Sequence, residues 1–183
     1  MTGIALPGSV SPLSGLIKNS NIQVINGRAL HADLQQLLGQ TVVMANDGNC
    51  FALSEACDGA GQRHEVVFGI TLGTGCGGGI AIHRQPFVGA WGNAAECGHI
   101  TLPGYREQHD GPPVRCYCGK DNCVESFVSG TGLSERSQLF SGQHLTGDAI
   151  VALAQQGEPN AVRQVARFRQ QLARTLATVV NLL

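Results

Sequence analysis

The chain has 183 residues, of which 43% are hydrophobic, so it is long enough to bury a sizeable core. Its 12 basic and 13 acidic side chains give a formal net charge of −1 without a basic run, which argues against nucleic-acid binding. No apolar stretch has the length of a membrane span and no signal peptide is apparent, so we expect a soluble, cytoplasmic protein. The 25 glycines are the informative excess, because clustered glycines mark tight turns and close approach of the backbone to ligands.

The first part of the chain alternates between strand and helix patterns, which predicts an α/β fold. A short buried strand is expected over 3–6, before Pro7-Gly8. Leucines at helical spacing predict a helix over 30–38 that stops at Gly39, and a strand over 41–45 follows directly.

A polar loop over 9–26 separates the first strand from that helix. Its amide side chains, Asn19 and Asn21, have the chemistry to bind hydroxyl groups of a polar ligand. The alternative is that they only satisfy the turns of the loop, and the spacing does not decide between the two.

The turn Asn46-Asp47-Gly48-Asn49 follows the strand over 41–45 and precedes a helix predicted over 50–57. Ligand groups in open α/β folds gather at the carboxyl ends of strands, so Asp47 stands where a catalytic carboxylate would lie. The alternative is a helix cap, because Asn, Asp and Gly are all common at helix N-termini.

A run of glycines lies between two further strands, predicted over 65–72 and 80–84. The run over 73–79 contains the spacing of a dinucleotide-binding fingerprint, but that motif requires a helix after it and here a strand follows. Backbone N–H groups in a turn without side chains can instead approach a phosphate closely. We therefore predict a phosphate-binding turn, with a purely structural hairpin as the alternative, that includes Gly73, Thr74, Gly75 and Gly77.

Helices are predicted to dominate from 124 onward, over 133–140, over 148–156 and in a long segment that begins at Pro159. Apolar residues keep helical spacing along the long segment, whereas most of its arginines lie off that stripe. The Pro-, Gly- and His-rich residues 100–113 are predicted to be an insertion that leads into a cysteine-rich loop.

One histidine and three closely spaced cysteines form the most specific pattern in the sequence: His99, Cys116, Cys118 and Cys123. These ligands suit a tetrahedral Zn²⁺ site, and four protein ligands leave no open position, so the zinc would be structural. The alternative is that the cysteines are buried apolar side chains or half of a disulfide set. The other cysteines stand singly among apolar neighbours and are predicted to lie in the core: Cys50, Cys57, Cys76 and Cys97.

Five segments, taken in order, resemble the ROK family of sugar kinases and related repressors. They are GIALPGSVSPLSGLIKNSN (3–21), ANDGNCFALSEA (45–56), LGTGCGGG (72–79), ECGH (96–99) and CYCGKDNCVE (116–125). The SVSP…KNSN and CYCGK…CVESF…SGTG stretches are most similar to the bacterial fructokinase branch, and the N-acetylglucosamine kinase branch is also similar. The resemblance spans essentially the whole chain.

This resemblance implies an actin-like (ribonuclease H-like) ATPase fold of two α/β lobes, with 1–46 in the N-terminal lobe and 47–183 in the C-terminal lobe. The second lobe would contain the zinc loop (96–125) and a helical segment (124–183). The resemblance also implies phosphorylation of a hexose by ATP with Mg²⁺, in a homodimer. Fructose is the expected substrate, with N-acetylglucosamine, mannose or glucose as alternatives.

Residue roles also follow from the matching motifs. Asp47 resembles the catalytic base that takes the proton from the sugar hydroxyl. Five residues resemble ligands of the sugar hydroxyls: Asn46, Asp47, Glu96, His99 and Glu125. His99 would bind zinc through one ring nitrogen and the sugar through the other. The glycine run matches the family's second phosphate-binding loop.

The sequence also departs from the family pattern. It contains neither the acidic Asp-x-Gly-Gly-Thr turn that grips the phosphates and Mg²⁺ nor the Gly-Gly-Gly segment that usually follows the long helix. We therefore expect the middle of a kinase, incomplete at both termini, with exposed apolar edges and no activity alone. Gly48 stands where alanine is usual. Asn122 replaces a glycine but tolerates a left-handed backbone, so we expect the loop to keep its shape.

A function of a different class is also open. The chain would then be a non-catalytic sugar-binding or regulatory module, as in the family's repressors. Those proteins carry a DNA-binding segment ahead of this core, and the sequence shows neither such a segment nor basic charge.

Overall fold

The computed structural model describes residues 1–183. In chain order its elements are β1 (Thr2–Leu6), β2 (Ser9–Val10), β3 (Ile17–Lys18), η1 (Gln23–Ile25), α1 (Leu30–Leu38), β4 (Val42–Asn46), α2 (Asp47–Cys57), β5 (Val66–Leu72), β6 (Cys76–Ile82), β7 (Gln85–Pro86), η2 (Cys97–His99), α3 (Glu107–Asp110), η3 (Val124–Ser126), α4 (Gly130–Ser141), α5 (Gly147–Gln155) and α6 (Pro159–Val180). None of the helices is both long enough and apolar enough to span a membrane.

The chain divides into two compact units, one made of 1–70 and 78–95 and the other of 71–77 and 96–183. The hairpin of β5 and β6 contributes to both, because its turn belongs to the second unit. The lobe boundary predicted between 46 and 47 stays a prediction.

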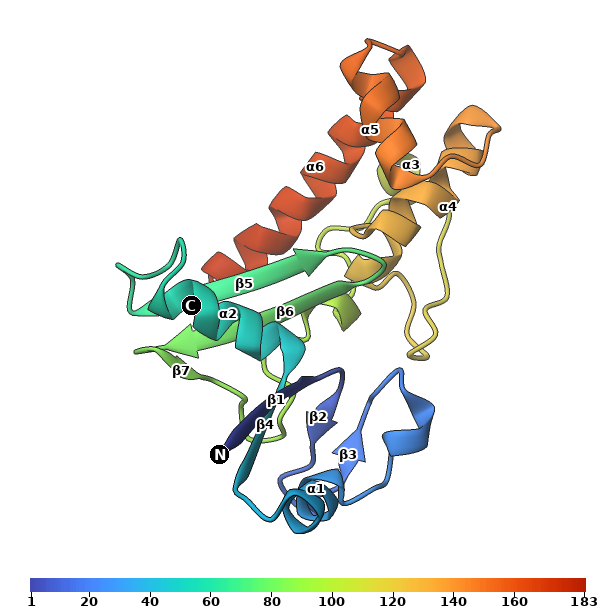
Figure 1. The fold of residues 1–183 in the computed structure, drawn as a ribbon. Coiled ribbons are helices and arrows are strands. Elements are labelled where there is room, and N and C mark those ends of the chain that lie inside the picture. Colours follow the sequence, from blue (N-terminus) through green and yellow to red (C-terminus); the bar gives the residue numbers. More distant parts are fainter. The chain divides into compact units, whose positions relative to one another are not determined.

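In the first unit, β1 and β4 pair in parallel, with Leu6 opposite Asn46 (Figure 1). The carboxyl ends of both strands therefore meet at one edge of this sheet. Leu6 and Val42 are buried. Val43, on the same sheet, is 52% exposed, and Leu37 of α1 is 80% exposed, so apolar side chains do reach solvent here.

Glycines bring helix α2 very close to strand β6. A Cβ on Gly79 would lie 2.0 Å from the carbonyl oxygen of Gly48, and a Cβ on Gly48 would lie 2.6 Å from that of Gly78. Small side chains continue the contact, since Ala52, Ala56 and Ala81 form a buried cluster. Backbone packing of this kind requires residues without a side chain.

This contact explains one correction to the predicted strands. The strand predicted over 80–84 instead begins at Cys76, so Gly77, Gly78 and Gly79 are strand residues. Only 73–75 remain as the turn. The strand also ends earlier than expected, because His83 and Arg84 form the next turn with φ of 49° and 58°.

In the second unit, α4, α5 and α6 pack against one another (Figure 1). Phe127, Val128 and Ile150 are buried in this unit. The predicted apolar stripe of α6 is only partly buried, and Val162 and Val180 are exposed. The residues of α6 that are most buried are mainly polar: Ala161, Gln164, Gln171 and Thr175. Gln171 faces inward because it bonds to a buried polar network, and the hydroxyl of Thr175 donates to the carbonyl of Gln171.

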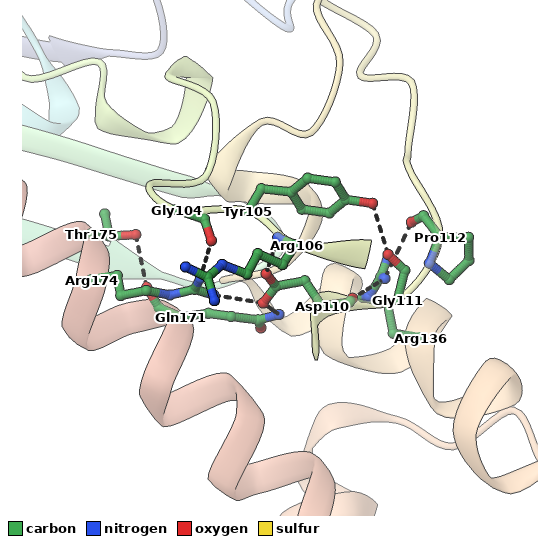
Figure 2. Close-up of polar contacts among 10 residues, drawn as sticks. All are labelled: Gly104, Tyr105, Arg106, Asp110, Gly111, Pro112, Arg136, Gln171, Arg174 and Thr175. Atoms are coloured by element: carbon green, nitrogen blue, oxygen red, sulfur yellow. Dashed lines mark hydrogen bonds and ion pairs between the residues drawn. The ribbon is translucent and has the colours of Figure 1, made fainter. Parts of the chain in front are cut away.

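Asp110 is the centre of that network and is only 1% exposed (Figure 2). It lies at the end of α3, inside the segment that the sequence predicted to be a simple insertion. Its carboxylate accepts hydrogen bonds from the backbone N–H of Arg106 (2.9 Å), from Gln171 Nε2 (3.1 Å) and from Arg174 Nη2 (2.5 Å). Burial by itself would raise the pKa of Asp110, but these hydrogen bonds outweigh burial and lower it.

Candidate active site and metal centre

Asp47 is the first residue of α2, and it is exposed at the edge where β1 and β4 end. The cap of this helix is Asn46. Its Oδ1 accepts from the N–H groups of Gly48 (2.9 Å) and Asn49 (3.3 Å), and its Nδ2 donates to the carbonyl of Gly8 (2.9 Å). Asp47 accepts one bond, from the same Gly48 N–H (2.9 Å). The capping role therefore falls mainly on Asn46, which leaves the Asp47 carboxylate free for other partners.

The side chains of Asn19 and Asn21 are exposed and make no hydrogen bond. The backbone groups of the turn are bonded instead by Asn26. Its Oδ1 accepts from the N–H of Ser20 (3.0 Å), and its Nδ2 donates to the carbonyl of Ser20 (2.8 Å). Asn19 contributes a left-handed backbone, with φ of 57°. The two amides remain free to bind a polar ligand.

The glycine turn has two backbone donors without a partner. The N–H of Gly73 donates to the carbonyl of Gly75 (3.1 Å), and the N–H of Cys76 donates to the carboxylate of Glu125. The N–H groups of Thr74 and Gly75 make no hydrogen bond. The carbonyl of Gly73 accepts from the N–H of Gly130, the first residue of α4 (2.7 Å), which holds the turn at that helix.

Glu125 fixes the other side of the turn. Its Oε2 accepts from the N–H of Cys76 (2.9 Å), across 49 residues of sequence. A Cβ on Gly75 would lie 2.4 Å from the same oxygen, so the carboxylate rests directly against the backbone of Gly75 and would have to move if this residue had a side chain. The turn and Glu125 thus form one arrangement within the second unit.

The four predicted zinc ligands come together. The ligand atoms of His99, Cys116, Cys118 and Cys123 all lie within 4.8 Å of one another. His99 Nδ1 is 3.8 Å from Cys116 Sγ, and Cys118 Sγ is 3.5 Å from Cys123 Sγ. Sulfur atoms at about 2.3 Å from a tetrahedral Zn²⁺ would be about 3.8 Å apart, so the donor set and its spacing fit zinc.

Backbone pairing brings His99 to the cysteines. Thr101 bridges Cys123, and Arg115 bridges Asp121, both in antiparallel fashion. Asn122 lies between these bridges with φ of 55°, a left-handed backbone of the kind that asparagine was expected to tolerate. Its Oδ1 also accepts from the N–H of Val114 (2.9 Å), which closes the loop.

Tyr117 is a residue that sequence reasoning missed. Its hydroxyl is 3.1 Å from His99 Nε2, the ring nitrogen expected to face the sugar. With Nδ1 on the metal, Nε2 carries the proton and donates to this hydroxyl. Burial of the hydroxyl end, followed by the charge of Glu125, raises the pKa of Tyr117 to about 12, although 82% of the residue is exposed. Its position between two zinc cysteines was the available signal.

The remaining residues singled out from the sequence differ in burial. Glu96 is exposed, directly before η2, and its carbonyl accepts from the N–H of His99 (3.2 Å). Cys76 and Cys97 are buried, as predicted. Cys50 is half-buried, and burial followed by the charge of Asp47 raises its pKa. The prediction for Cys57 is wrong, because it ends α2 and is exposed. All seven cysteines are free thiols.

The predicted site residues therefore fall into two groups. Asn46 and Asp47 belong to the first unit. Glu125, the glycine turn and the predicted zinc ligands belong to the second, where Glu125 bonds to the end of the turn and the four predicted ligands form a cluster.

The fold is the actin-like ATPase fold of solved sugar kinases, and it carries a Cys₃His loop in its second unit. The model of the ROK family matches residues 1–183, and the chain belongs to this family.

Curated and solved relatives agree with that assignment. The chain is 37% identical over 182 residues to an N-acetyl-D-glucosamine kinase of Photobacterium profundum, covering 98% of this chain and 60% of the relative. A ROK family glucokinase of Streptomyces griseus, solved with glucose and AMPPNP, superposes with a TM-score of 0.77 at 31% identity, over 98% of this chain and 61% of that one. A ROK family transcriptional regulator, a homologue of the E. coli MLC protein, has a TM-score of 0.78 at 27% identity, over 98% and 46%. The chain thus spans about 60% of the length of the curated relatives.

Proposed function

We propose that this chain carries the phosphoryl-transfer centre of an ATP-dependent hexose kinase whose substrate is N-acetylglucosamine. The observation that carries the proposal is the exposed carboxylate of Asp47 at the shared carboxyl edge of β1 and β4. Relatives named N-acetyl-D-glucosamine kinase support the choice of sugar. Fructose, which the motif resemblance favoured, is untested and is the alternative substrate.

Asp47 is the proposed general base. A hexose hydroxyl is a weak nucleophile, and its attack on the γ-phosphorus of ATP becomes easier as its proton passes to a carboxylate. The new P–O bond forms to the sugar oxygen, the bond to the β-phosphate oxygen breaks, and ADP leaves with Mg²⁺. Asn46 would keep Asp47 in place, since its cap fixes the first turn of α2.

The glycine turn is the proposed contact for phosphate. The unpaired N–H groups of Thr74 and Gly75 are suitable donors to phosphate oxygens, and Gly73 and Gly77 keep the surrounding backbone clear of side chains. The glucokinase solved with AMPPNP, an ATP analogue, supports nucleotide binding in this family.

Glu96, His99 and Glu125 are the proposed sugar ligands of the second unit. Zinc would fix the orientation of the His99 ring, because one nitrogen bound to metal leaves the other a donor. That donor faces Tyr117 in the structure, so a sugar hydroxyl that binds it would replace or share the Tyr117 hydroxyl.

Sugar binding and phosphoryl transfer need separate measurements. Calorimetry should show binding of N-acetylglucosamine that Glu125→Gln weakens at least tenfold. In a form of the protein that phosphorylates N-acetylglucosamine, measured by the release of ADP, Asp47→Asn should lower kcat by at least about a thousandfold with little change in sugar affinity. Asp33→Asn, which alters an exposed carboxylate on α1, is the matched control. Equal loss of binding and transfer in Asp47→Asn would contradict the general-base role.

A second candidate is a sugar-binding regulatory module. The similarity to the transcriptional regulator favours it. Sugar binding without ADP release, in the presence of ATP and Mg²⁺, would support this function over the kinase.

A further inference from the structure

A hollow between α4 and α6 contains two arginines without an acidic partner. It measures about 240 Å³, including space open to solvent. Its walls include Phe127, Arg136, Phe140, Gln164, Arg167 and Gln171. None of these residues belongs to the proposed active site or the metal centre.

Arg136 is buried (6% exposed) but uses only one guanidinium nitrogen. Its Nη2 donates to the carbonyl oxygens of Asp110 and Pro112 (Figure 2), whereas Nε and Nη1 have no hydrogen-bond partner. The guanidinium also lies 4.3 Å from the centre of the Phe127 ring. Burial, together with the like charge of Arg167, lowers the pKa of Arg136. A buried cation with unpaired donors is costly unless a ligand meets it.

Arg167 brings a second unpaired charge to the same hollow. Its guanidinium lies 3.6 Å from the centre of the Phe140 ring and makes no hydrogen bond or ion pair. The nearby carboxylate of Asp110 is already bound by Arg174 and Gln171.

Gln164 is the third polar group of the hollow. It is 4% exposed, and its Oε1 has no partner. Rotation of this amide by half a turn would present its N–H₂ group instead, so the hollow can offer donors from three side chains.

We propose that this hollow binds a monatomic anion, chloride, between Arg136 and Arg167. The hollow has room for about one water-sized particle, which fits a halide better than a phosphate or carboxylate group. The anion would neutralise part of the charge of both arginines and satisfy the unpaired donors of Arg136. Because the arginines belong to α4 and α6, a bound anion would also join these helices.

The test compares the thermal unfolding midpoint of the purified chain in sodium chloride and in sodium gluconate at equal ionic strength. Chloride at ten times its dissociation constant should raise the midpoint by about 3 to 6 °C, with a saturating dependence on concentration. Arg167→Gln should abolish the difference. Arg163→Gln should retain it, because Arg163 lies one turn earlier on α6, is exposed and bonds to Asn160 instead.

Chlorine-35 NMR gives a readout that does not depend on stability. The wild type and Arg163→Gln should broaden the chloride signal, and Arg167→Gln should broaden it less. Equal midpoints in chloride and gluconate, or an unchanged response in Arg167→Gln, would overturn the site. Stronger stabilisation by inorganic phosphate than by chloride would overturn the assignment to a monatomic anion.

Discussion

Replacement of Asp110 by asparagine should cost about 3 kcal/mol of unfolding free energy. Asp110 is 1% exposed, accepts three hydrogen bonds and pairs with Arg174, so its loss leaves a partly buried cation without its counterion. Breaking one side of a buried pair costs about 3 to 5 kcal/mol. The lower end applies because the Arg174 side chain is 33% exposed and can turn to water.

The assay for Asp110→Asn is thermal or urea unfolding at pH 7. For a chain of this size, about 3 kcal/mol corresponds to a fall of about 6 to 12 °C in the midpoint. Asp121→Asn is the matched control, because the Arg115–Asp121 pair is 68% and 62% exposed and should contribute less than about 1 kcal/mol. Equal effects of the two substitutions would refute the reasoning.

The same pair predicts a pH dependence with a definite sign. The pKa of Asp110 is lower in the folded chain than its ordinary value of about 3.9. The stabilisation is therefore fully present above about pH 4 and is lost as the pH falls through the folded pKa. The difference between wild type and Asp110→Asn should stay constant from pH 7 to about pH 5 and shrink only in more acidic solution.

Three further outcomes follow from local contacts. Gly79→Ala should destabilise the chain by at least about 1 to 3 kcal/mol in urea unfolding, because its Cβ would meet the Gly48 carbonyl; an unchanged midpoint would contradict the close approach of α2 to β6. Asn46→Ala should cost about 1 to 2 kcal/mol through the lost cap, and Asp33→Ala should cost almost nothing. The purified chain should contain one zinc by elemental analysis, Cys123→Ser should contain much less, and Cys57→Ser should match the wild type; similar zinc content in both variants would refute the ligand set.

Much of the local structure could be predicted because short segments carry their own signals. The helix over 30–38 ends at Gly39 in a left-handed conformation, as expected, and Pro159 begins α6. The three zinc cysteines lie within eight residues, so their spacing alone indicated a metal loop. For His99 the sequence indicated only that histidine is a residue type that binds zinc. Whether its ring lies near the cysteines depends on the backbone pairing between Thr101 and Cys123.

What the tertiary structure decided is where polar residues are buried and which partners satisfy them. The periodicity of α6 predicted an apolar face, yet Gln171 faces inward because the carboxylate of Asp110, 61 residues earlier, accepts a hydrogen bond from it. The buried Thr175 is satisfied within α6, since its hydroxyl donates to the carbonyl of Gln171. The glycines of β6 looked like a turn because their role depends on Gly48 of α2, which lies 31 residues before Gly79. Apolar periodicity is a local property, whereas the free energy of a buried polar group depends on partners from distant segments. The sequence by itself therefore determined the family, the candidate metal ligands and most elements, and only the folded chain revealed the Asp110 network, Tyr117 beside His99 and the unpaired arginines of the hollow.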